Sequence, residues 1–103
     1  MKKEALSSNE LALMQQVFSR HAGLRDVTLF GSRAKGTHSY NSDIDLSIRG
    51  ELDLLQAEAL ASELDELPLP YRFDVVSFDS LKSQPLREHI ERVGVVIYSA
   101  RNA

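Results

Sequence analysis

Residues 26–48 read DVTLFGSRAKGTHSYNSDIDLSI, and the spacing of small and acidic residues in this stretch is unusual. An apolar run ends in the Gly31-Ser32 turn, and Asp43 and Asp45 follow further along. Residues two apart on a strand leave the same face roughly 7 Å apart. Two carboxylates so placed repel each other, and a cation bound between them is the simplest reason for keeping both.

Hydrophobic periodicity predicts helices on both sides of this stretch. Apolar residues at three- and four-residue steps predict a first helix that begins after Ser7 and stops at Gly23. A second helix is expected to begin after Asp53 and to be stopped by Pro68. Ser7 and Asp53 are each followed three residues later by Glu or Gln, which is the capping-box pattern. A last helix is expected over residues 85–93.

Short β-branched and apolar runs alternate with these helices. Strands are predicted over residues 26–30, 42–48, 71–78 and 95–98. The order α-β-α-β-α-β-α predicts an α/β (α+β) fold with helices packed on a small sheet. Periodicity alone leaves open whether that sheet is parallel or mixed.

Length and composition limit the possible functions. The 103 residues are enough for a single domain with one modest core. The absence of cysteine excludes disulfides, thiol nucleophiles and thiolate zinc sites. The net charge is −3 and the basic residues are scattered, which argues against direct nucleic-acid binding. The first residues, MKKEALSSNE, lack the apolar core of a signal peptide, so a cytoplasmic location is expected.

A third carboxylate, Asp74, interrupts the apolar run at residues 71–78. An acidic residue among apolar neighbours needs a partner for its charge, and Arg72 is the ordinary candidate. Together with Asp43 and Asp45 it would instead complete the ligands of a two-metal centre for Mg²⁺ or Mn²⁺. Three solvated surface charges remain the alternative interpretation.

The Gly-Ser turn has the composition of a phosphate-binding turn. Gly31 permits a tight bend and close approach of a ligand to the backbone. Ser32 would begin a short helix, where free N–H groups and the helix dipole attract phosphate. Ser42, directly before the first aspartate, could donate a further hydrogen bond. Arg33 and Lys35 could contact a triphosphate or could simply face water.

The whole combination resembles the nucleotidyltransferase superfamily typified by DNA polymerase beta. It is most similar to the minimal nucleotidyltransferases (MNT), which often serve as antitoxins in HEPN/MNT toxin–antitoxin pairs. The resemblance runs from about Val27 to Val76, and the ending IERVGVVIY is also similar. It implies one nucleotidyltransferase domain over residues 1–103, with a small mixed β-sheet flanked by helices.

The resemblance also implies roles for the motif residues. In this family the Gly-Ser turn holds the phosphates of a nucleoside triphosphate, and three carboxylates hold two divalent metals. Gly31 and Ser32 match the phosphate positions, and Asp43, Asp45 and Asp74 match the metal-binding and catalytic positions. None of the expected residues is replaced.

The implied activity is Mg²⁺-dependent transfer of a nucleoside monophosphate, with AMP from ATP expected, to a hydroxyl of a partner protein. A HEPN ribonuclease toxin is the partner that the resemblance implies. The main alternative is a non-catalytic antitoxin that neutralises its partner by contact alone. Modification of a small molecule is disfavoured, because the chain has no room for a second substrate-binding domain. The sequence leaves open the acceptor, the nucleotide preference, the oligomeric state and the roles of Lys35, His38 and Tyr40.

Overall fold

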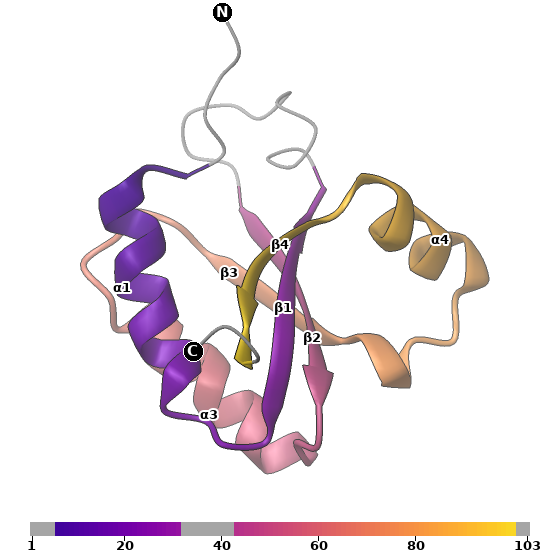
Figure 1. Cartoon of the computed structure of the whole chain (residues 1–103), viewed down its shortest axis with the longest axis horizontal. Helices are drawn as coiled ribbons and strands as arrows, with labels where there is room; N and C mark the ends of the chain where they lie inside the picture. Colours follow the sequence, from indigo (N-terminus) through magenta and orange to yellow (C-terminus); the bar gives the residue numbers. More distant parts are fainter. Residues whose placement is uncertain (1–5, 32–42, 101–103) are drawn as a thin grey trace, which may run out of the picture.

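The computed structural model describes residues 6–31 and 43–100, and within them four strands form one mixed sheet (Figure 1). The strands are β1 (Leu24–Phe30), β2 (Ile44–Gly50), β3 (Phe73–Ser77) and β4 (Val95–Ser99). Their order across the sheet is β3-β2-β1-β4. Strand β1 is antiparallel to β2 and β4, whereas β2 and β3 are parallel. The predicted small mixed sheet is therefore confirmed.

Three α-helices and a short 3₁₀ helix accompany the sheet in the described part of the chain. They are α1 (Ser8–Ser19), α3 (Leu54–Asp65), η1 (Phe78–Ser80) and α4 (Gln84–Val93). In Figure 1, α1 and α3 lie together on one side of the sheet, and α4 lies on the other. No described helix has the length and apolar character needed to cross a membrane.

Both predicted capping boxes are present, and they fix where α1 and α3 begin. The backbone N–H of Glu10 donates to Ser7 Oγ (3.2 Å), and the N–H of Ser7 donates to the Glu10 carboxylate (2.9 Å). Asp53 and Gln56 make the same reciprocal pair at 2.8 and 2.9 Å. A cap of this kind contributes about 1 kcal/mol to helix stability.

One face of the sheet, here called the helical face, carries the core. Alternation along β2 directs Ile44, Leu46 and Ile48 to this face, and all three are buried. Helices α1 and α3 pack over them because their own apolar stripes face inward. The buried cluster comprises Met14, Val17, Phe18, Leu24, Val27, Leu29, Ile44, Leu46, Ile48, Leu60 and Leu64.

The opposite face, here called the site face, is more polar. Thr28 of β1 stands opposite Ser47 of β2, and Phe30 stands opposite Asp45. A smaller cluster of Phe30, Phe78 and Ile90 attaches η1 and α4 to this face. Helix α4 therefore covers part of the face that carries Asp45.

Alternation along β1 places the charged residue Asp26 on the site face together with Thr28 and Phe30. Asp26 is only 8% exposed there. Its carboxylate accepts from Arg49 Nε (3.1 Å) and from a terminal guanidinium nitrogen (3.0 Å). The Arg49 guanidinium also lies 5.7 Å from the centroid of the Phe78 ring. The buried carboxylate is thus held in a paired, hydrogen-bonded state.

Some predicted boundaries were wrong. Helix α1 ends at Ser19, four residues before Gly23. Gly23 instead lies against the backbone of Glu51, where an added Cβ would overlap the carbonyl oxygen. The predicted strand over residues 71–78 is shorter, because the chain bends into η1 at Phe78.

We predict that Arg49→Gln destabilises the fold by about 1–3 kcal/mol, because it leaves the carboxylate of Asp26 buried without a charged partner. Urea denaturation at neutral pH measures the change. The double variant Asp26→Asn/Arg49→Gln should recover part of the loss. Equal stability of Arg49→Gln and wild type would contradict the structural role of the pair.

Candidate active site

Gly31 and Asp45 are packed directly against each other where β1 ends. Gly31 follows Phe30 with a φ of +78°, a conformation that favours glycine. Phe30 is opposite Asp45 in the β1–β2 register, so the chain leaves β1 beside the Asp45 side chain. A Cβ at position 31 would overlap Oδ2 of Asp45. The position therefore requires glycine for both its backbone conformation and its close contact.

The parallel pairing of β2 with β3 places Asp45 opposite Asp74. Strand alternation then directs both side chains to the site face. Asp43 stands two residues before Asp45, at the entrance to β2, and is exposed. The three predicted carboxylates therefore come from adjacent positions at one end of two neighbouring strands.

The charges of these residues act on one another. Partial burial raises the pKa of the Asp45 carboxyl, and the negative charges of Asp74 and then Asp43 raise it further. Negative charges close to a carboxyl group disfavour its ionised form. The site is thus an end of the sheet where negative charge accumulates.

Asp74 has apolar neighbours in sequence but is not buried among them. Its side chain is exposed, because β3 is the edge strand of the sheet. Within the described residues, Asp74 forms no ion pair with Arg72. Among the described residues, its charge is therefore accommodated by exposure to solvent and not by Arg72.

The donor set suits a hard divalent cation bound together with substrate. Among the described side chains, no group of three or more acidic or histidine residues forms a ready-made cage for a metal ion. Mg²⁺, however, is usually held by one or two carboxylates plus substrate phosphates and waters. Asp45 with Asp74 or Asp43 offers carboxylate oxygens of that kind, so the residues fit a cation that arrives with a nucleotide.

Several predicted residues lie in the segment 32–42, outside the described residues. The roles predicted for them, and the short helix predicted after Gly31, remain predictions. These residues are Ser32, Arg33, Lys35, His38, Tyr40 and Ser42.

A cavity of about 230 Å³ on the site face was not predicted. Thr28 and Ser47 of the sheet line it, together with Arg49, Phe78 and Glu91. Ser47 is two residues beyond Asp45 on the same face of β2, so the cavity continues along the strand that carries the carboxylate. Period-two alternation could have identified Ser47, but the walls come from segments that are distant in sequence.

Comparison with known proteins shows which family shares the domain of this chain. The family "Polymerase beta, Nucleotidyltransferase" matches residues 13–103. A curated relative from Haemophilus influenzae, "Probable protein adenylyltransferase MntA", is 36% identical over 94 residues, covering 89% of this chain and 82% of the relative.

Solved structures show the same fold. A toxin–antitoxin complex with AMP-PNP contains a chain that is 26% identical with a TM-score of 0.72, and the match covers 94% of this chain and 77% of that one. A tri-AMPylated Shewanella oneidensis HEPN toxin in complex with its MNT antitoxin gives 20% identity and a TM-score of 0.70. That match covers 94% of this chain and 76% of the other, and at this identity it concerns the fold alone.

We predict that Gly31→Ala destabilises the protein by about 1–2 kcal/mol, the usual cost of a left-handed conformation with a Cβ, and displaces the Asp45 side chain. Chemical denaturation measures the loss. Truncating the opposing carboxylate in Gly31→Ala/Asp45→Ala should relieve the overlap but not the backbone strain. If the two substitutions changed the free energy of unfolding by strictly additive amounts, the direct contact between Gly31 and Asp45 would be contradicted.

We predict that Asp45→Asn stabilises the metal-free protein at pH 7. The folded-state pKa of Asp45 is raised, so its ionisation costs stability as the pH rises through that value. Asparagine does not ionise, and solvent screening of a partly exposed group limits the gain to about 0.5 kcal/mol, or roughly 2–4 °C in Tm.

Thermal unfolding in EDTA tests this prediction. The gain should disappear below about pH 4, where the wild-type carboxyl is protonated in both states. Glu88→Gln, on the exposed surface of α4, is the control and should show no such gain. A gain that persists unchanged at pH 3 would show that repulsion is not its cause.

Proposed function

This chain belongs to the polymerase beta nucleotidyltransferase family, and we propose that it transfers AMP from ATP to a hydroxyl of a partner protein, the toxin of a HEPN/MNT pair. The observation that carries the proposal is the register that sets Asp45 opposite Asp74 and beside Gly31. The name of the 36% identical relative supports the reaction. The toxin–antitoxin complex with AMP-PNP supports both a protein partner and an adenine nucleotide.

Each residue of the site has a part in the proposed reaction. Gly31 lacks a side chain, so the phosphate chain can approach the backbone beside Asp45. Asp43, Asp45 and Asp74 would hold the divalent cation, with Mg²⁺ expected and two ions in the complete site. Such a cation neutralises phosphate charge and lowers the pKa of a hydroxyl close to it.

The transfer itself is an in-line displacement. The acceptor oxygen forms a bond to the α-phosphorus while the bond from that phosphorus to the bridging oxygen of the β-phosphate breaks. Pyrophosphate leaves, and AMP remains on the acceptor. Asp74 is the carboxylate on the exposed edge strand, so it is the residue we assign to receive the proton of the acceptor hydroxyl.

A contact-only antitoxin is the second candidate. The clustering of carboxylates around Asp45 argues against it, because repulsion of this kind disfavours the metal-free fold. A domain that had no use for the cluster would gain stability by losing one of its members. Retention of all three is more readily explained by a cation that they bind.

We predict that Asp45→Asn slows adenylylation of the toxin by at least about 100-fold, since even a residue that only orients a metal ligand contributes 10–100-fold. Binding of the toxin should be retained. Mass spectrometry of the toxin after incubation with ATP and Mg²⁺ follows the modification, and calorimetry measures binding.

The control is Glu88→Gln, which should match wild type in both assays. Rapid modification by Asp45→Asn would remove Asp45 from the catalytic set. Neutralisation of the toxin by wild type and by Asp45→Asn alike, with no AMP transferred by either, would establish the contact-only alternative.

A further inference from the structure

Strand β3 presents an open backbone edge. It pairs with β2 on one side, and no described strand pairs with its other side. The N–H of Ile44 donates to the carbonyl of Arg72 (2.8 Å), so alternation directs the backbone groups of Phe73 and Val75 away from β2. Such an edge is a ready template for another strand.

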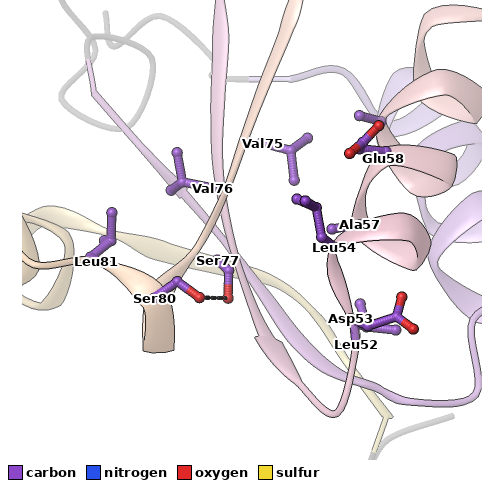
Figure 2. A pocket seen from close by; sticks show the side chains of 11 residues that line it. Leu52, Asp53, Leu54, Ala57, Glu58, Val75, Val76, Ser77, Ser80 and Leu81 are labelled. Atoms are coloured by element: carbon purple, nitrogen blue, oxygen red, sulfur yellow. Dashed lines mark hydrogen bonds between the residues drawn. The ribbon is translucent and has the colours of Figure 1, made fainter.

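A groove of about 410 Å³ lies along this edge (Figure 2). Val75 points to one side of the strand, toward Leu54 and Ala57 of α3, and Val76 points to the other side, toward Leu81. Leu54 is 76% exposed. The edge is therefore flanked by apolar side chains on both faces, as an added strand with alternating apolar residues would require.

The charged side chains that line the groove are both acidic, and neither lysine nor arginine is among the described residues that line it. Asp53 and Glu58 line the groove itself, and Figure 2 shows both on the α3 side. Charge complementarity favours a segment with lysine or arginine near its apolar residues.

We propose that the outer edge of β3 binds an extended segment of the partner protein by strand addition, and that this segment carries the acceptor hydroxyl opposite Asp74. The proposal rests on the proposed function and specifies how its protein substrate is held. The segment has apolar side chains on both faces and basic residues near them.

Strand geometry explains why this docking mode would serve the reaction. An added strand lies 4.7–4.9 Å from its neighbour, and directly opposite residues have Cβ atoms about 5 Å apart. A residue opposite Asp74 sends its side chain to the site face, where Asp45 also lies. A serine, threonine or tyrosine at that register therefore places its hydroxyl beside the carboxylates.

Two neighbouring leucines provide a matched test. Leu54 and Leu55 are 76% and 77% exposed, but only Leu54 lines the groove. Leu54→Ser should weaken toxin binding by about 10-fold, as expected for a well-packed apolar contact, and slow AMP transfer at limiting toxin. Leu55→Ser should change toxin binding and the rate of AMP transfer by less than about twofold each. AMP-PNP binding, measured by calorimetry, should be the same in both variants.

Amide hydrogen exchange distinguishes strand addition from docking of a helix in the same groove. In the complex with toxin and AMP-PNP, the amide of Val75 should exchange at least about 10-fold more slowly, because it gains a hydrogen bond. The amide of Val76, which already faces β2, is the internal control. An effect of Leu54→Ser without protection of Val75 would overturn strand addition.

Failure of the inference can be told apart from failure of the proposed function. Equal effects of Leu54→Ser and Leu55→Ser, with normal AMP transfer by wild type, would overturn the docking site alone. A wild-type protein that binds AMP-PNP but neither binds nor modifies the toxin would overturn the proposed function, and the inference with it.

Discussion

The pairing of β2 with β3 forces Asp45 and Asp74 to stand opposite each other in spite of their like charges. The core beneath β2 is what maintains that pairing. Ile44 and Leu46 leave the other face of the same strand and are fully buried. Burial of such side chains contributes about 1.5–3 kcal/mol each, which exceeds the repulsion between partly exposed carboxylates. A slip of β3 by one residue would also turn Phe73 and Val75, which pack against the same core, to the opposite face.

The two faces of the sheet consequently have different roles. The helical face, covered by α1 and α3, supplies the stability, while the site face gathers polar groups at the end of β1 and at the starts of β2 and β3. Gly31 completes this arrangement, because its missing side chain leaves room for the Asp45 carboxylate. The negative charge is thus built into a rigid part of the fold.

Local patterns in the sequence predicted most of the elements. The caps at Ser7 and Asp53 act within one helical turn, so their residues alone identified them. Alternation likewise placed Asp43 and Asp45 on one face. The residue types suggested that Asp74 joins Asp43 and Asp45 at a metal centre, but the parallel register that sets Asp45 opposite Asp74 forms across an intervening helix and could not be read from local patterns.

Other features could not be read from the chain. The apolar neighbours of Asp74 suggested that its charge needs a partner, but β3 is the edge strand of the sheet and the side chain is exposed. Gly23 looked like a helix stop, but its role is a close contact with Glu51, far along the sequence. The groove beside β3 was missed for a related reason, since its walls come from α3, β3 and η1.

If the carboxylates around Asp45 hold a divalent cation together with a nucleotide, Mn²⁺ titrated in the presence of AMP-PNP should broaden the backbone amide signals of nearby residues. Gly31, Asp45 and Asp74 should lose their signals first, and Asp45→Asn should abolish the effect. Broadening that begins at the acidic residues of α3, or that is the same in Asp45→Asn, would show that the cation is not bound by these carboxylates.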